Sequence, residues 1–151
     1  MKRPSRTTLA GATAPFRHVL IPSDLTARAQ PALDLVTTLA LPAGSRITLL
    51  HVIETIDGLG ARELKSFYAR LAKKARTTLS TLAKRPTRTP IEVAVVQGRR
   101  ADTIVSFAAA NGVDLIVLPS HRVNPSMVNR DWGSISYKVS ILAQCPVLLV
   151  K

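Results

Sequence analysis

The chain has 151 residues, of which 46% are hydrophobic, enough for one domain with a buried core. Its formal net charge is +12, its pI is about 11.1, and its single cysteine is Cys145. One cysteine excludes an intramolecular disulfide, and no apolar run approaches the roughly 20 residues of a membrane span. We therefore expect a protein of a reducing compartment, the cytoplasm, with no membrane association.

The first fifteen residues carry basic and hydroxyl side chains but lack the apolar centre of a signal peptide. We interpret residues 1–15 as a disordered basic tail and residues 16–151 as one domain. An organellar transit peptide is a weaker interpretation, because the segment is short and has no amphipathic period.

The first predicted elements are a strand, a helix and a second strand. Residues 18–22 form a short apolar run that ends at Pro22. Residues 29–40 repeat apolar side chains every three or four positions, which predicts a helix with Thr26 as its N-cap. Residues 47–53 are almost continuously apolar, as expected of a strand covered on both faces.

The remaining elements continue this alternation. A long basic helix, with an apolar side from residue 64 to residue 82, precedes a strand at 91–96. A helix at 101–111 closes at Gly112, in the C′ position, and a strand follows at 115–118. After a loop at 119–132, a helix directs Ile135, Val139 and Leu142 inward, and residues 147–150 form the last strand.

Strands that alternate with helices predict an α/β fold, here a doubly wound, five-stranded, mostly parallel sheet with helices on both faces. In such sheets, ligands bind beyond the carboxyl ends of the strands, where the strand order reverses. The residues that this rule selects are Ser23, Asp24, Val52, Ile53, Glu54, Gly98, Arg99, Arg100, Ser120, His121, Arg122, Gly133 and Ser134.

Each candidate also has a purely structural interpretation. Asp24 either helps to cap the first helix or contacts a ligand, and the sequence favours neither role. His51 and His121 have no second ligand at metal-binding spacing, so structural hydrogen bonds are the favoured interpretation. Ser134 fits an N-cap, and Cys145 fits a packing role. No nucleophile has an adjacent base, so we expect neither an enzyme nor a metal site.

The positive charge is unevenly distributed. Nine of the 21 basic residues lie between Arg62 and Arg88, where Glu63 is the only acid. A solvated helix face is the simplest interpretation. Because aromatic residues are not interleaved with these cations, we expect nucleic-acid binding to be absent, or else nonspecific and strongly weakened by salt.

An ordered set of short motifs resembles the universal stress protein family from about residue 17 to the C-terminus. The motifs are residues 22–24, residues 49–52, Gly98, residues 113–117, Ser120 with His121, Gly133 with Ser134, and residues 145–150. The resemblance implies a five-stranded sheet of the adenine nucleotide alpha hydrolase-like class, a role in stress survival and, in one branch, binding of ATP or AMP. It also implies a homodimer through the C-terminal edge strand, at residues 146–151.

The nucleotide-binding branch has a phosphate loop of the form Gly-x2-Gly-x9-Gly-Ser/Thr, from which this chain departs. Pro119 and Arg122 occupy the first two glycine positions, and Gly133 follows one residue late. Pro119 has no N–H, and Arg122 crowds the approach of a phosphate. The resemblance therefore leaves a reduced nucleotide or anion pocket, made of Pro22, Asp24, Val52, Arg122, Gly133 and Ser134.

The leading sequence-based interpretation is a universal stress protein that acts in stress adaptation through dimerisation and partner contact. We expect no firmly held cofactor and only weak binding of ATP or AMP. The alternative is a stress sensor that binds an adenine nucleotide or another anion. Nonspecific nucleic-acid binding through the basic helix and tail is the third and least favoured function.

Overall fold

The computed structural model describes residues 16–39, 41–55, 61–120 and 134–151, with the side chains of residues 61–63 not described. Every strand and helix predicted from the sequence is present, in the predicted order. The elements are β1 (His18–Pro22), α1 (Ala29–Thr38), β2 (Arg46–Ile53), α2 (Ala61–Ala83), β3 (Ile91–Gln97), α3 (Arg100–Ala110), β4 (Leu115–Pro119), α5 (Ile135–Leu142) and β5 (Val147–Val150).

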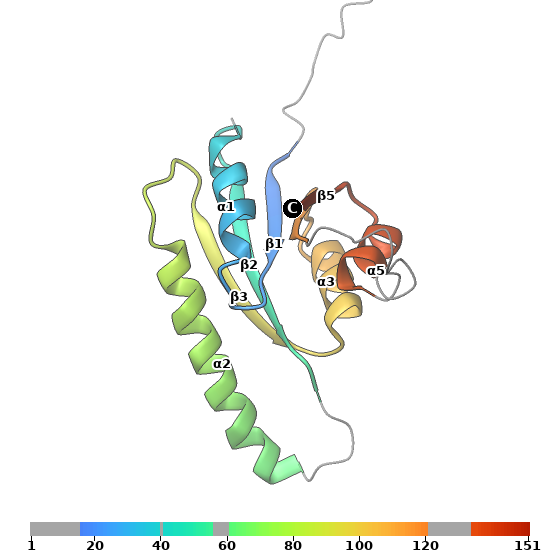
Figure 1. Cartoon of the computed structure of the whole chain (residues 1–151). Coiled ribbons are helices and arrows are strands. Elements are labelled where there is room, and N and C mark those ends of the chain that lie inside the picture. The colour runs from blue at the N-terminus through green and yellow to red at the C-terminus, as the bar shows by residue number, and fades with distance from the viewer. Residues whose placement is uncertain (1–15, 40, 56–60, 121–133) are drawn as a thin grey trace, which may run out of the picture.

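The five strands form one sheet in the order β3-β2-β1-β4-β5, and every neighbouring pair is parallel. The chain winds outward from β1 in one direction to β3 and then in the other to β5, so the strand order reverses between β1 and β4. Helices α1 and α2 cover one face, and α3 and α5 cover the other (Figure 1). The expected doubly wound α/β fold is confirmed.

Each face of the sheet has its own apolar core, because successive side chains of a strand point to opposite faces. Val19 and Ile21 of β1 pack with α1 and α2, whereas Leu20 between them packs with α3 and α5. All three side chains are fully buried. This two-sided burial explains why the central strands read as continuous apolar runs.

Two expected details are wrong. Thr26 is not the N-cap of α1, because residues 25–28 form a turn and the helix begins only at Ala29, with Arg28 at the cap position. The Thr26 hydroxyl accepts a hydrogen bond from the Arg28 N–H at 3.3 Å and so stabilises that turn. Leu142 does not face the core, since its side chain is 46% exposed, while Val139 is buried as expected.

Glycines occupy both ends of α3 where the backbone has positive φ. Gly112 follows the C-cap residue Asn111 with φ +62°, which confirms the expected C′ position. Gly98 has φ +150°, and a Cβ there would collide with the Thr103 hydroxyl. A side chain is therefore excluded at the turn that carries the chain from β3 into α3.

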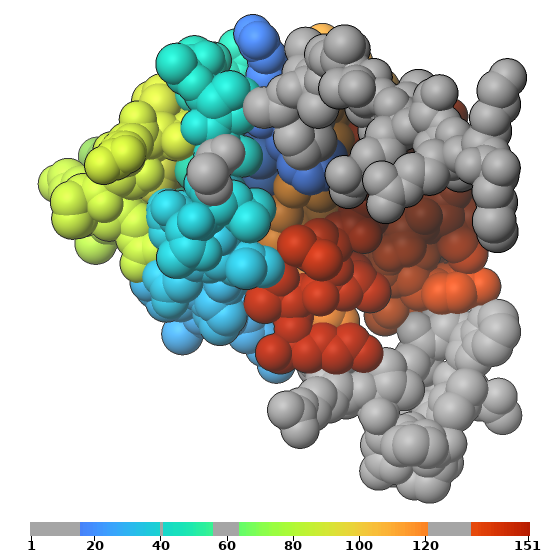
Figure 2. All heavy atoms as spheres, turned by 90° about the horizontal axis from the view of Figure 1, so that it is seen from above, coloured from blue at the N-terminus to red at the C-terminus, as the bar shows by residue number. Residues whose placement is uncertain are grey.

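The edge strands β3 and β5 lie at opposite ends of the molecule. In the space-filling view the yellow-green residues at the end of α2 and the red C-terminal segment lie apart, with the blue-cyan residues of α1 between them (Figure 2). Leu148 and Leu149 of β5 are each 39% exposed. Among the described residues, no helix is both long and apolar enough to span a bilayer.

Candidate functional site

A cavity of about 200 Å³ opens at the carboxyl ends of β1, β2 and β4, where the strand order reverses. We call it the strand-end pocket. Its described lining is Pro22, Ser23, Asp24, Arg28, Leu50, Val52, Arg100, Ile104, Leu118, Pro119, Ser120, Ser134, Ile135 and Ser136. The cavity thus combines an apolar floor of strand residues with a polar rim from the loops and helix starts.

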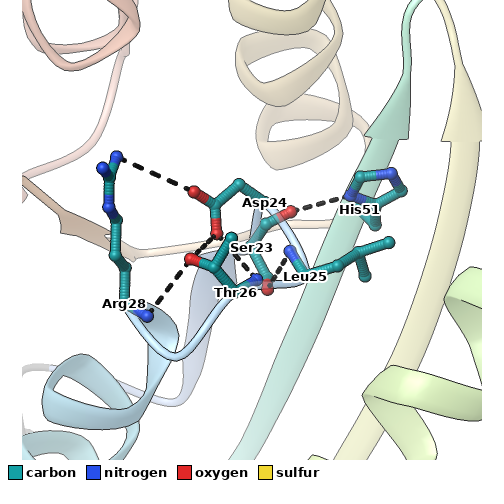
Figure 3. A network of polar contacts seen from close by, with 6 residues as sticks. All are labelled: Ser23, Asp24, Leu25, Thr26, Arg28 and His51. Carbon is teal, nitrogen blue, oxygen red and sulfur yellow. Dashed lines mark hydrogen bonds and ion pairs between the residues drawn. The ribbon is translucent and has the colours of Figure 1, made fainter.

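The loop from β1 to α1 forms one wall and is fixed by backbone contacts. The Ser23 N–H donates to the Leu50 carbonyl at 2.8 Å, and His51 Nδ1–H donates to the Ser23 carbonyl at the same distance (Figure 3). Leu25 has φ +67°, a conformation that typically costs 1–3 kcal/mol for a residue other than glycine. The Ser23 hydroxyl oxygen accepts from the Leu25 N–H at 3.1 Å and supports this strained turn.

Asp24 lies at the tip of this loop with its two carboxylate oxygens in different surroundings (Figure 3). Oδ1 accepts from the Thr26 N–H at 2.9 Å and from the Thr26 hydroxyl at 2.5 Å. Among the described residues, Oδ2 forms an ion pair with Arg28 at 3.9 Å. One oxygen therefore holds the turn, while the other retains capacity to accept a hydrogen bond from a ligand.

The pKa of Asp24 lies below the ordinary 3.8. Partial burial acts to raise it, but the hydrogen bonds from Thr26 and the positive charge of Arg28 together outweigh burial. The carboxyl group is therefore ionised at neutral pH. It presents an acceptor, and no proton donor, to the pocket.

Two arginines bring positive charge to the pocket. Arg28 is largely exposed, and Arg100 lies in the first turn of α3, where its guanidinium forms a 2.9 Å ion pair with Glu54. Because a guanidinium carries five N–H donors in a planar fork, one ion pair leaves donors of Arg100 for a second partner. Both side chains have the chemistry to meet an anionic ligand.

The start of α5 forms the opposite side of the pocket. Ser134 is the N-cap, and its hydroxyl oxygen accepts from the Tyr137 N–H at 3.2 Å, which confirms the capping role. Ser136 in the first turn also lines the cavity. The N-terminal N–H groups and the helix dipole place partial positive charge at this side.

The structure brings most of the expected site together. Pro22, Asp24, Val52 and Ser134 all line the strand-end pocket, as do Ser23, Ser120 and Arg100, which the strand-end rule also selected. Arg99, Gly98, Ile53 and Glu54 are outside its lining, although Glu54 binds Arg100. The expected residues Arg122, Gly133 and His121 lie outside the described residues.

Sequence reasoning missed two polar lining residues, Arg28 and Ser136. Arg28 lies four positions after Asp24, a spacing that suits an ion pair, but only the turn at residues 25–28 brings the two to one cavity. The list of candidate residues would have included Ser136 if it had continued past the N-cap Ser134 into the first turn of α5.

Reactive groups are not gathered in the described part of the site. No three His, Cys, Asp or Glu side chains lie together as a metal site among the described residues. His51 makes a structural hydrogen bond, as expected. Cys145 packs, half-buried, beside the core under α3 and α5; burial and the Asp114 carboxylate raise its pKa, so the thiol stays protonated at neutral pH.

This arrangement defines a class of protein: a doubly wound α/β domain with a polar-rimmed pocket at the switch point of its sheet. Residues 15–151 match the model of the universal stress protein family. A universal stress protein from Thermus aquaticus is 30% identical over 138 residues, which cover 90% of this chain and 99% of that protein. The chain belongs to the universal stress protein family.

Solved structures with lower identity share the fold. UspA from Lactobacillus plantarum is 22% identical, covers 91% of this chain and 99% of its own, and superposes with a TM-score of 0.71. A universal stress protein from Archaeoglobus fulgidus in complex with dAMP is 18% identical over 91% of this chain and 99% of its own, with a TM-score of 0.57. A universal stress protein in complex with cAMP is 20% identical over 91% of this chain and 98% of its own, with a TM-score of 0.61.

Proposed function

We propose that this universal stress protein binds an adenine nucleoside monophosphate in the strand-end pocket, as a sensor in stress adaptation. The observation that carries the proposal is the pairing, in one cavity, of an apolar floor with a single ionised acceptor and a cationic rim. Complexes of two family members with dAMP and cAMP support the choice of ligand class. The sequence alone favoured partner contact, and we now favour ligand binding because of the composition of the pocket.

Each part of such a ligand has a matching group in the lining. Val52 and Ile104 offer apolar contact to a flat base. Asp24 Oδ2 would accept a hydrogen bond from an exocyclic amine or a ribose hydroxyl. The start of α5, with Ser134, would hold the phosphate, and the guanidinium of Arg100 would add a charge-assisted contact.

A monophosphate fits this chain better than a triphosphate. Pro119, on the pocket wall, supplies no N–H where the nucleotide-binding branch has glycine, and Arg122 replaces the second glycine. Each missing charge-assisted hydrogen bond is worth roughly 1.5–3 kcal/mol, so two would weaken binding of a polyphosphate by about a hundredfold or more.

The proposed role is binding without catalysis. Among the described lining residues there is no His, Cys or Lys, and the one carboxylate, that of Asp24, is engaged by Thr26 and Arg28. We place this activity in the cytoplasm, in keeping with the sequence-based expectation.

Isothermal titration with AMP and with magnesium and ATP tests the proposal. We expect AMP to bind with a Kd of about 10–100 μM and ATP to bind at least roughly tenfold more weakly. Asp24→Ala should weaken the affinity for AMP by about tenfold. Lys138→Gln, on the exposed side of α5, is the control and should leave that affinity unchanged. Tight ATP binding that Arg122→Ala abolishes would contradict the monophosphate preference.

A further inference from the structure

The outward side of α2 carries a dense row of cations that the strand-end pocket does not use. We call it the cationic face of α2. It consists of Lys65, Arg70, Lys73, Lys74 and Arg76, with Lys84 directly after the last residue of the helix. All six side chains are exposed. In Figure 1, α2 lies on the outer flank of the molecule, with no other element beyond it.

The six cations have no described counter-charge. The ion pairs among the described residues join Arg28 to Asp24, Arg85 to Asp34 and Arg100 to Glu54, none of which is on the cationic face. Like charges that are three or four positions apart on a helix repel each other. An acidic partner would relieve that repulsion, so the face is electrostatically complementary to carboxylates.

Small side chains lie between these cations and leave a shallow depression in the surface of the helix. A shallow trough along the helix is lined by Ala69, Ala72, Lys73, Arg76, Thr77, Ser80, Thr81 and Lys84. The Thr77 hydroxyl donates to the Lys73 carbonyl at 3.0 Å, and the Thr81 hydroxyl donates to the Thr77 carbonyl at 3.0 Å. These hydroxyl protons are therefore committed to the helix backbone.

The opposite side of α2 anchors it. Ala75 and Leu79 are buried against the sheet, and the helix is 23 residues long, or about 34 Å at 1.5 Å per residue. Small residues at a helix surface let a second helix approach to about 8 Å between the axes. A pre-formed, anchored helix also loses little conformational entropy when a partner binds.

We propose that the cationic face of α2 is a docking surface for an acidic α-helix of another protein. A second copy of this chain would bring the same positive charge to the contact and be repelled. A nucleic acid would gain ionic contacts but little base stacking, because α2 has only two aromatic side chains: Tyr68 is buried, and Phe67, at 41% exposed, is a single ring that packs edge-on against it.

Fluorescence anisotropy with defined probes tests this proposal. The first probe is a synthetic helical peptide of roughly 20 residues with a glutamate-flanked alanine seam; the second has the same composition with a central proline that breaks the helix. A duplex DNA oligonucleotide is the third. We expect the helical peptide to bind at least about tenfold more tightly than the proline peptide and more tightly than the DNA.

Two variants separate charge from shape. Lys73→Glu with Arg76→Glu should weaken binding of the helical peptide by at least about tenfold. Ala69→Leu fills the trough without changing the charge and should weaken that binding by about fivefold. Lys138→Glu with Arg17→Glu makes the same charge change at two exposed cations outside the cationic face of α2 and should change binding of the helical peptide by less than about twofold. Circular dichroism and AMP titration confirm that each variant is folded.

Four outcomes would overturn the proposal. Equal binding of the helical and the proline peptides, or unchanged binding of the helical peptide to the Ala69→Leu variant, would mean that charge alone determines the binding. Tighter binding of the DNA duplex would assign the face to a phosphate backbone. Failure of the helical peptide to bind, while AMP still binds, would reject the docking surface and leave the pocket proposal standing.

Discussion

The two carboxylate oxygens of Asp24 have different surroundings, and both contribute to the proposed site. Its Oδ1 atom accepts from Thr26 and stabilises the turn at residues 25–28, and its Oδ2 atom lies near Arg28 at the edge of the pocket. Removal of the carboxyl group would thus loosen the turn and take away the acceptor together. Asp24→Ala should therefore lower both the stability of the native state and the affinity for the ligand.

The lowered pKa of Asp24 makes its contribution to stability depend on pH. The folded-state pKa is below 3.8, so the ionised carboxylate stabilises the native state fully above about pH 5, and this contribution is lost as the pH falls through the folded-state pKa. Urea unfolding should show Asp24→Ala to be less stable than the native chain by about 1 kcal/mol at pH 7. The difference should shrink toward pH 3. A difference that stays constant or grows on acidification would contradict this assignment.

Residue-level roles could be predicted where they follow from position at the end of a strand or helix, as for Asp24, Gly112 and Ser134. The strand-end rule located Asp24, but it gave no role to Asp114, whose carboxylate accepts from the backbone N–H groups of Arg17 and His18 at 2.8 and 3.0 Å. Nor did it reveal that buried His18 bridges the Asn111 carbonyl and the Thr48 hydroxyl. Such bonds join residues distant in sequence, and no local pattern encodes them.

At the scale of elements, α5 and β5 form an incompletely covered edge. The period of α5 predicted an inward Leu142, yet Leu142 and its neighbour Ile141 are exposed because α5 lies over a short edge strand. Leu148 and Leu149 of β5 extend this apolar surface, and the red C-terminal segment reaches the surface in Figure 2. An apolar strand edge of this kind invites pairing with another strand.

We therefore expect a homodimer through β5, with residues 146–151 at the two-fold axis. Light scattering after size-exclusion chromatography should give the mass of a dimer for the native chain at micromolar concentration. Leu149→Lys should shift it to monomer, because a charge at the edge blocks strand pairing. Leu35→Lys changes a similarly exposed leucine on α1 and should remain dimeric. A native chain that runs as monomer would refute this interface.

At the scale of the whole molecule, the sequence predicted the architecture because strand and helix periods alternate without interruption. The topology then located the pocket, since β1 and β4 are the neighbours between which the winding reverses. What the sequence could not predict is which side chains converge there. Arg28 reaches the pocket through a turn that replaces the expected first turn of α1, a matter of tertiary packing.

The most direct test of the central claim, an adenine monophosphate pocket at the strand ends, is a titration of ¹⁵N-labelled protein with AMP followed by NMR. We expect saturable shift changes for Ser23–Arg28, Leu50–Val52 and Ser134–Ser136, with α2 and β5 unaffected. Asp24→Ala should shift the titration curve to about tenfold higher AMP concentration. Shift changes confined to α2 or β5, or none up to about 5 mM AMP, would rule out the strand-end pocket as the binding site.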